Sequence, residues 1–317
     1  PSAVAYIQSL KLGGPTFFLD YNNVTVKCIH CAPGDTGRVK GVLYEAVDRD
    51  LLLKRKGEGA DLSKVCTSLV TDMNSIFKNA ASFNGDISSW DVSKVNNMRS
   101  MFEGASAFNK NIGLWHVGNV TDMAAMFRSA SQFNQDIGSW NVGKVTNMSG
   151  MFLAASAFDQ PLGNWDVSSV TNMSYMFNEM KFNQTIGNWD VSNVRDMSGM
   201  FFNAFLFNQD IGSWDVSNVS KMDGMFYKAT VFNQDLKKWC VSNIPAEPTS
   251  FSSNSALTEG NKPIWGKCPQ TYVPDDHFEQ ALIDLGYDSG PLDNYVKTVT
   301  ISKITALDVA NKNIKNL

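Results

Sequence analysis

The sequence predicts a repeat solenoid of about seven coils, each about 25 residues long, with a cap at each end. Two observations support this fold class. A stretch such as "FNQDIGSWDVSNVSKMDGMF" occurs in seven similar copies, and the tryptophans of these copies lie 24 or 25 residues apart. A unit of this length is too short to bury its own apolar face, so it has to pack on its neighbours. The repeated tryptophans are Trp90, Trp115, Trp140, Trp165, Trp189, Trp214 and Trp239.

Each unit is expected to hold a short parallel strand, a turn and one helical turn, in the manner of a leucine-rich-repeat-like coil. Segments such as "DIGSW" are predicted to be extended. In "VTNMSGMF" the two Met and the Phe stand at i, i+3 and i+4, which is the spacing of one helical face. A parallel ladder advances about 4.7–5 Å per strand. We therefore expect each Trp, Met and Phe to pack on its equivalents in the coils before and after it.

Two polar columns are predicted to form ladders inside this array. One precedes the first Met of each unit and holds mostly Asn or Asp, and the other follows Phe. A side-chain amide at the corner of a coil can hydrogen-bond the backbone of its own coil or of the next one. We interpret both columns as structural and not as metal or ligand sites. The second column holds Asn84, Asn109, Asn134, Asn183, Asn208 and Asn233.

The overall composition is that of a globular protein, with 43% hydrophobic and 18% charged residues and a net charge of −4. This charge provides no basic surface for a nucleic-acid partner, and no apolar run reaches the about 18 residues that suggest a membrane span. The chain starts at Pro1 without an apolar leader and ends in "NKNIKNL". We expect it to be a piece of a longer protein.

The five cysteines all lie at the borders of the repeated block. This placement suits disulfides that fasten the end caps in an oxidising compartment. Cys240 and Cys268 bracket an irregular segment after the repeats, and we predict a disulfide between them. Cys66 is expected to pair with Cys28 or Cys31 across the front cap, which leaves one thiol over.

Two other interpretations of the front cysteines remain open. Cys28, His30, Cys31 and Cys66 could form a zinc site with three sulfur ligands and one imidazole, although three ligands within four residues are closer together than is usual. Cys28 and Cys31 also form a Cys-x-x-Cys motif. A redox role would require this motif to open a helix, whereas here it follows a strand-like segment and runs into Pro33.

With these columns assembled, the sequence resembles the BspA-like bacterial surface proteins with 25- to 26-residue repeats, which are abundant in Bacteroidota. The motif "W-D-V-S-N-V-x-x-M-x-x-M-F-x-x-A-x-x-F-N-x-x-I-G-x-W" carries the resemblance and covers residues 68–244. The flanking segments also resemble parts of such proteins. Residues 20–67 are similar to the opening cap, 245–270 to the closing cap, and 271–317 to the start of a second leucine-rich-repeat domain. Residues 1–19 are interpreted as a linker or the end of a preceding module.

The resemblance implies a function by class. Proteins of this kind are secreted or displayed on the cell surface, in Bacteroidota often through type 9 secretion, and they act in adhesion and binding. We therefore expect a non-enzymatic module of a larger multidomain chain that serves as a rigid spacer and binding surface. Its expected partner is a protein or glycan at the cell surface, with no nucleic acid, no direct membrane insertion and no cofactor.

No catalytic constellation stands out in the sequence. His116 occupies a position where other units carry mostly Asp, and we interpret it as variation in a solvated turn. His277 is predicted on the surface of a helix, and neither histidine has a nearby nucleophile with an orienting acid. "GEGADLSK" lacks the Gly-Lys-Ser/Thr ending of a phosphate-binding loop. We therefore predict that the chain is not an enzyme.

Positions that differ between units are the best pointers to binding, because packing does not dictate them. The residue after Met-Phe is charged in the first three units, whereas the later units carry apolar or aromatic residues nearby. Clustered exposed apolar residues often mark a contact surface. The alternative is that these groups fill a gap left by the one-residue deletion in the fourth repeat. The predicted docking patch consists of Tyr175, Met180, Phe202, Phe205 and Tyr227.

Carbohydrate binding through surface aromatics is the second candidate function. A regular column of exposed tryptophans could stack on successive sugar rings. The competing interpretation is that the seven tryptophans pack on one another as core.

Overall fold

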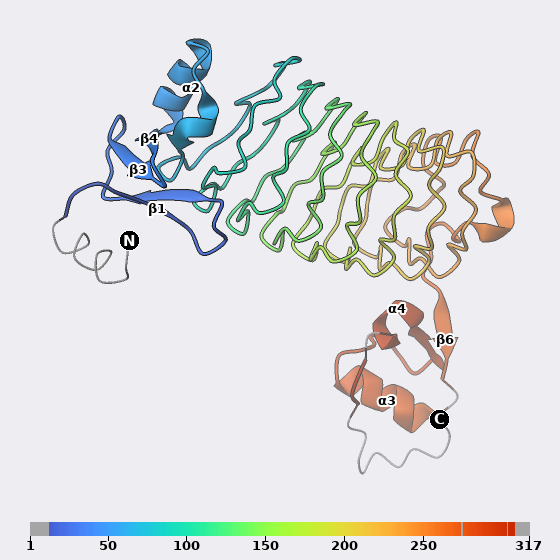
Figure 1. The fold of residues 1–317 in the computed structure, drawn as a ribbon. Coiled ribbons are helices and arrows are strands. Elements are labelled where there is room, and N and C mark those ends of the chain that lie inside the picture. The colour runs from blue at the N-terminus through green and yellow to red at the C-terminus, as the bar shows by residue number, and fades with distance from the viewer. Residues whose placement is uncertain (1–12, 274, 303, 308–317) are drawn as a thin grey trace.

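The computed structural model describes residues 13–273, 275–302 and 304–307. In Figure 1 these residues form a front cap, a long row of stacked coils and a small C-terminal unit beside the far end of the row. The predicted linker falls largely outside the described residues, and so does the predicted repeat domain beyond residue 307. The described elements are β1 (Thr16–Leu19), β2 (Val26–Ile29), β3 (Thr36–Val39), β4 (Val42–Ala46), α2 (Arg49–Gly57), the 3-10 helix Leu62–Lys64, β5 (Val65–Cys66), the 3-10 helix Glu259–Asn261, β6 (Gln270–Tyr272), α3 (Asp276–Asp284), β7 (Tyr295–Lys297) and α4 (Thr298–Ile301).

The front cap consists of two small sheets and one helix. Strands β1 and β2 pair antiparallel, as do β3 and β4, and β4 also pairs in parallel with β5. Helix α2 begins after Asp48, whose carboxylate accepts a hydrogen bond from the amide of Leu51, the usual N-cap arrangement. Because β5 leads directly into the first repeat, the cap is connected to the coils through the β-sheet of β3, β4 and β5.

The repeats form turns and single-residue bridges and contain no regular elements. Between residues 68 and 258, all of which the structure describes, there is neither an α-helix nor a strand longer than one residue. Parallel bridges connect successive repeats at Asp72 with Asn97, and at Asn97 with Asp122. The ladder therefore lies in the Asn/Asp column before Met, and the prediction that placed it in "DIGSW" is wrong.

Left-handed residues explain why the Met-Met-Phe segment is not helical. Each coil has two residues with positive φ, four positions apart, and each one interrupts a helical turn. The backbone then directs alternate amides at the next coil: Met98 N donates to Asp122 O at 2.9 Å and Ser100 N to Ala124 O at 2.8 Å. The first left-handed position, with φ of 54° to 61°, holds Ser75, Ser100, Ala125, Gly150, Tyr175, Gly199, Gly224 and Ser250.

Like side chains stack on like throughout the core, as predicted. The Phe that follows Met has a ring centroid 5.5 to 6.0 Å from its equivalent in the next coil. The Trp rings are nearly parallel at both ends of their column, where Trp90 and Trp115, and likewise Trp214 and Trp239, are inclined by 4°. Each Trp of the column also donates its indole N–H to a backbone carbonyl, as Trp140 does to Ile112 O at 3.1 Å. The tryptophans are thus buried, and their one polar group is hydrogen-bonded.

The Asn column after Phe forms the expected ladder. Asn84 Oδ1 accepts from the amide of Asn109 at 3.0 Å, and Asn109 Oδ1 accepts from the amide of Asn134 at the same distance. The column before Met behaves differently, because Asn97 Oδ1 accepts from Arg99 N within its own coil. In both columns the side-chain oxygen is thus occupied by a backbone amide, which supports a structural role for these residues.

Cations of α2 cover the open edge of the first coil. In every later coil the carbonyls at this edge accept amides from the coil before, and the first coil has no such neighbour. Arg49 takes this role by donating to Asp72 O at 2.8 Å and to Asn74 O at 2.6 Å, and Lys56 donates to Ile76 O. The front cap therefore satisfies backbone acceptors that stacking leaves unpaired.

The coil pattern continues past the point where the sequence period ends. We predicted an irregular cap after Ile244, but Gly224 N donates to Thr249 O at 2.9 Å and Phe226 N to Phe251 O at 2.7 Å, as between repeats. Ser250 has the expected positive φ. One further coil thus forms without the motif, since its backbone only has to accept hydrogen bonds from the coil before it.

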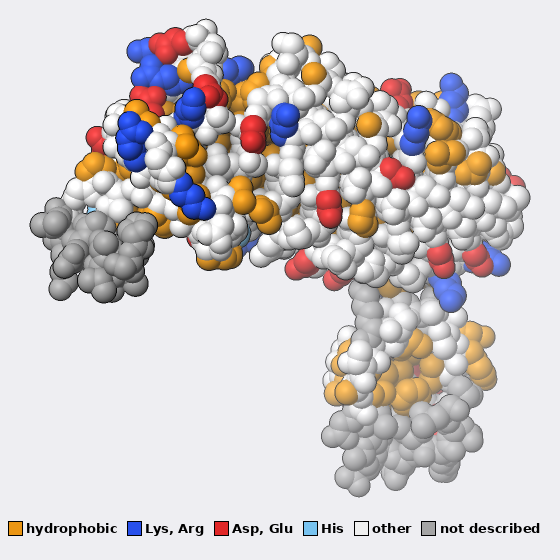
Figure 2. Space-filling view, viewed as in Figure 1, with side chains coloured by type: hydrophobic (Ala, Val, Ile, Leu, Met, Phe, Trp, Pro, Cys, Tyr) orange, Lys and Arg blue, Asp and Glu red, His pale blue; other side chains and the backbone are white. Residues whose placement is uncertain are grey.

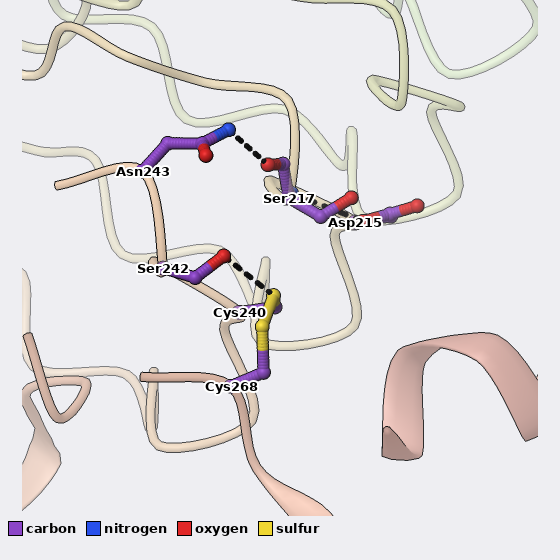
Figure 3. Close-up of a disulfide and its surroundings, with 6 residues drawn as sticks. All are labelled: Asp215, Ser217, Cys240, Ser242, Asn243 and Cys268. Carbon is purple, nitrogen blue, oxygen red and sulfur yellow. Dashed lines mark hydrogen bonds between the residues drawn. A yellow bond between two sulfur atoms is a disulfide. The ribbon is translucent and has the colours of Figure 1, made fainter. Parts of the chain in front are cut away.

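The closing segment is fastened by the predicted disulfide between Cys240 and Cys268. Figure 3 shows this bond, with Ser242 Oγ 3.8 Å from Cys240 Sγ. Asn243 donates to Ser217 O in the preceding coil at 2.8 Å. The disulfide therefore joins the end of the Trp column to the segment that leads into β6.

The C-terminal unit has a small core of its own. Strands β6 and β7 pair antiparallel, and Val273, Leu282 and Val296 are buried between this pair and α3. Glu279 on α3 is fully buried and accepts the backbone amides of residues 293 and 294. Among the residues described, no helix is both long and apolar enough to cross a membrane.

Candidate interaction surface

The structure places four of the five predicted patch residues on the surface and buries the fifth. Tyr175 is 45% exposed and Phe205 38%, while Phe202 and Tyr227 are half-buried. Met180 is wholly buried and belongs to the core, so its assignment to the patch is wrong. It stands where most other units carry Ala, in the coil that is one residue shorter. The gap-filling alternative is thus correct for Met180 only.

Tyr175 occupies a backbone position that disfavours its side chain. Its φ is 58°, and the same position holds Ser, Ala or Gly in every other coil. A bulky residue in the left-handed region is a true outlier, with a cost of about 1–2 kcal/mol. The exposed ring recovers little of this by burial. Such strain at a surface aromatic favours a role in contact with another molecule.

Gly199 in the next coil makes room for the Tyr175 ring. A Cβ on Gly199 would stand 2.4 Å from Tyr175 Cε1 and 2.5 Å from Cδ1. The ring therefore lies against the backbone of Gly199. The side chain nevertheless stays 45% exposed.

Two further aromatic rings lie on the coils that follow Tyr175. Phe202 and Tyr227 stack at 4.7 Å between centroids with a 27° tilt. Phe202 also lies over Gly224, where a Cβ would stand 3.6 Å from the Phe202 ring, an ordinary contact distance. Lys228 places its ammonium 5.3 Å from the Tyr227 ring centroid, within cation–π range. We call Tyr175, Phe202 and Tyr227, with the glycines beneath them, the aromatic row.

Three more apolar side chains are exposed a few residues further along the same coils. Phe205, Leu206 and Val231 are 38%, 46% and 43% exposed. Thr230 donates to Phe205 O, which connects the two coils at this point. Figure 2 shows hydrophobic side chains at the surface of the far coils, with Lys and Arg side chains near them. Val231 was missed by the sequence analysis, although its column holds Ser82, Ala107 and Gln132 in earlier units.

The equivalent surface of the first coils is ionic and paired. Lys78 Nζ lies 3.0 Å from Glu103 Oε2. Burial raises the pKa of Glu103, but hydrogen bonds from Ser100 and Lys78 outweigh it, so the pKa stays below its ordinary value. The contrast along the array therefore runs from compensated charge at the front to exposed aromatic carbon at the back.

The tryptophan column does not form a sugar-binding platform. Its seven members are between 0% and 4% exposed, and the indole N–H groups are engaged with carbonyls of the neighbouring segment or coil. Recognition by aromatic side chains therefore has to use exposed rings other than the tryptophan column, such as Tyr175 of the aromatic row.

The front cysteines lie close together in the structure and are not bonded to one another. Cys28, Cys31 and Cys66 are free thiols, so the predicted bond from Cys66 to Cys28 or Cys31 is not formed, although Cys28 and Cys66 lie in one buried cluster. Within the described part of the chain, no group of three or more His, Cys, Asp or Glu side chains could hold a metal ion. His30 does not belong to this cluster, and its side chain is exposed.

His116 has a more specific environment than predicted. Its Nε2 lies 3.2 Å from the hydroxyl of Tyr21 and 3.6 Å from Asp20 Oδ2. Both partners belong to the turn between β1 and β2. Asp20 in turn pairs with Lys27 at 2.8 Å. His116 thus connects the front cap to the second coil, contacts that the sequence interpretation did not include, while its side chain stays 37% exposed as expected of a solvated position.

The described structure is that of a repeat protein with a periodic aromatic core, small sheets and few helices. The chain matches the family described as "Mycoplasma protein of unknown function, DUF285" in two overlapping segments, residues 53–165 and 146–263. These segments together span more than half of the sequence, and the chain belongs to this family. No curated protein and no solved structure matches it.

Proposed function

We propose that the chain is a non-enzymatic interaction module whose leucine-rich-repeat-like solenoid serves as a rigid spacer and presents the aromatic row to a partner. The strained and exposed Tyr175 is the observation that carries this proposal. Coil packing accepts Gly, Ala or Ser at this position, so packing alone gives no reason for Tyr.

The setting we propose is a secreted or cell-surface protein of the BspA-like type, with the module forming part of a larger multidomain chain. The disulfide between Cys240 and Cys268 supports an oxidising compartment. The partner is a protein or glycan at the cell surface. Type 9 secretion is the proposed route of export.

Stiffness follows from how the coils are joined. Adjacent coils share several backbone hydrogen bonds, such as Phe102 N to Met126 O at 2.8 Å and Gly104 N to Arg128 O at 2.8 Å. The stacked rings between them add contacts at every step. Because every coil is fixed to the next in this way, the aromatic row is held on a firm support, which lowers the ordering cost of binding.

Tyr175→Gly tests the proposal directly. The replacement installs a residue that other coils carry at this position, so the unfolding free energy should stay within about 1 kcal/mol of the parent or rise. Binding to surface protein or glycan should weaken by about tenfold or more. The pair Phe202→Ser and Tyr227→Ser is the companion variant, and Arg128→Ser at the ionic end is the matched control. Lost stability in Tyr175→Gly would show that the ring only fills space.

Carbohydrate binding is the second candidate, and one observation favours it. The Tyr175 ring contacts Gly199 along its Cδ1–Cε1 bond and stays 45% exposed, and an exposed aromatic ring is a group on which a sugar ring can stack. An array of bacterial and host polysaccharides, probed with the parent chain and with Tyr175→Gly, separates the candidates. A glycan signal that disappears in the variant supports this candidate, and an array without Tyr175-dependent signals refutes it.

A further inference from the structure

Three cysteines gather in the front cap, two of them buried and one accessible. Cys28 on β2 and Cys66 on β5 are 3% and 0% exposed and lie in the same apolar cluster. Cys31, two residues beyond the end of β2, packs on this cluster from a half-buried position. The order from the surface inward is therefore Cys31, Cys28, Cys66.

Hydrogen bonds hold the two buried cysteines side by side. The amide of Cys28 donates to Ser68 Oγ at 3.0 Å, and Cys66 Sγ lies 3.3 Å from Val26 O. These contacts cross between β2 and the segment that opens the first coil. Ser68 is itself fixed by Asp91, whose Oδ2 accepts its hydroxyl at 2.6 Å. The strands thus cannot drift apart without breaking a buried network.

The thiols interact with one another along this line. A hydrogen bond with Cys66, together with burial, raises the pKa of Cys28. The same bond lowers the pKa of Cys66, with support from Ser68 and against the effect of burial. Burial also raises the pKa of Cys31, and its hydrogen bond with Cys28 opposes this. Cys28 is therefore the middle thiol, in contact with both others.

We propose that these three thiols form a disulfide relay that takes oxidising equivalents from a low-molecular-weight disulfide at Cys31 and delivers them as a bond between Cys28 and Cys66. Direct oxidation of the buried pair is disfavoured because a bulky disulfide cannot reach it, and exchange requires access to the attacked sulfur. The accessible Cys31 thiol is therefore where the small disulfide first reacts.

The relay consists of three exchange steps. The Cys31 thiolate attacks the small disulfide, which forms a mixed disulfide on Cys31 and releases one small thiolate. Cys28 then attacks the Cys31 sulfur of that bond, which joins Cys28 to Cys31 and releases the second small thiolate. Finally the Cys66 thiolate attacks Cys28, which forms the buried bond and returns Cys31 as a thiolate. In sum, the Cys28 and Cys66 thiols are oxidised to a disulfide, and the small disulfide is reduced to two thiols, which take up the two protons that these cysteines lose.

The product would tie the β1–β2 hairpin to the start of the coils. In the thiol form β2 and β5 are joined by packing and by the contact of Cys66 Sγ with Val26 O, whereas the bond would connect them covalently. The relay also gives the odd cysteine a role: Cys31 is needed for formation of the bond and is absent from the final one.

Time-resolved trapping of the full chain tests the relay. The folded protein, with Cys240 and Cys268 still joined, is mixed with oxidised glutathione, quenched by alkylation and mapped as non-reduced peptides. We expect glutathione first on Cys31 and then a bond between Cys28 and Cys66. Cys31→Ser should slow formation of that bond by at least about tenfold, because the remaining thiols are buried.

Two further variants stop the relay at defined points. Cys66→Ser should accumulate the bond between Cys28 and Cys31, and Cys28→Ser should retain glutathione on Cys31. Near-UV circular dichroism checks that each variant keeps its aromatic core. An unchanged rate in folded Cys31→Ser overturns the relay. So does a parent chain in which Cys31 is glutathionylated and the buried bond never forms.

Discussion

Gly187→Ala is predicted to destabilise the array by forcing two coils apart. Gly187 belongs to the repeated "IGxW" segment. A Cβ at this position would stand 2.4 Å from the backbone carbonyl oxygen of Asp210 in the next coil. Real Cβ contacts essentially never fall below 3.0 Å. The glycine is required by this close approach and not by its φ, which is not in the left-handed region.

The size of the effect follows from what has to move. Both walls of the contact are backbone, so the coils must separate by at least about 0.6 Å, the difference between 2.4 and 3.0 Å, and flexible side chains cannot absorb the shift. Overpacking of this kind costs about 1–3 kcal/mol. We expect a value near the upper end, about 3 kcal/mol, since the neighbouring ladder bonds and ring stacks are strained together. For a chain of 317 residues that lowers Tm by about 4–5 °C.

Urea unfolding followed by tryptophan fluorescence measures this loss, because the Trp column crosses the affected coils. Gly260→Ala is the matched control, since a Cβ there meets nothing within 4 Å, and its midpoint should stay unchanged. A Gly187→Ala midpoint that corresponds to less than about 0.5 kcal/mol of destabilisation would refute the argument that backbone contact sets the coil spacing.

Three further predictions concern the caps and the short coil. Arg49→Met should lower the unfolding free energy by about 1–3 kcal/mol, since it leaves two carbonyls of the first coil without donors; thermal unfolding with Arg38→Met as an exposed control checks this. Met180→Ala should cost about 2–5 kcal/mol by opening a cavity, and a neutral result would contradict its place in the core. The pKa of Glu45 is lowered by its hydrogen bond to Arg55, so this pair stabilises the fold above the ordinary value of 4.5 and the stabilisation disappears as pH falls below it. Glu45→Gln should therefore flatten the dependence of Tm on pH between about pH 3 and 5, and an unaltered profile would speak against the pairing.

The sequence predicted the stacked core well because each column follows directly from the period. A Trp or Phe that has to pack on its own equivalents recurs at the same interval. The bond between Cys240 and Cys268 could also be predicted, since both residues stand at the border of the repeats. Of the candidate surface, Tyr175 and Phe205 could be recognised because they break their columns without serving the core.

The backbone of the Met-Met-Phe segment and the environment of His116 could not be predicted, because both depend on contacts between residues 24 to 95 positions apart in the sequence. Left-handed residues such as Ser100 and Tyr175 are placed by hydrogen bonds to the following coil, so the local Met-Met-Phe spacing wrongly indicates a helix. The contact of His116 with Tyr21 joins segments that no period relates.

The sequence by itself thus determined the repeat and its columns of like residues, because residues that pack on their equivalents in the next coil recur at the same interval in the sequence. Only the tertiary structure decided which exceptions to the period face solvent. Met180 and Tyr175 look alike as exceptions in the sequence, yet one fills the space of the shortened coil and the other lies over Gly199. That difference depends on the volume available between coils, which no single unit specifies.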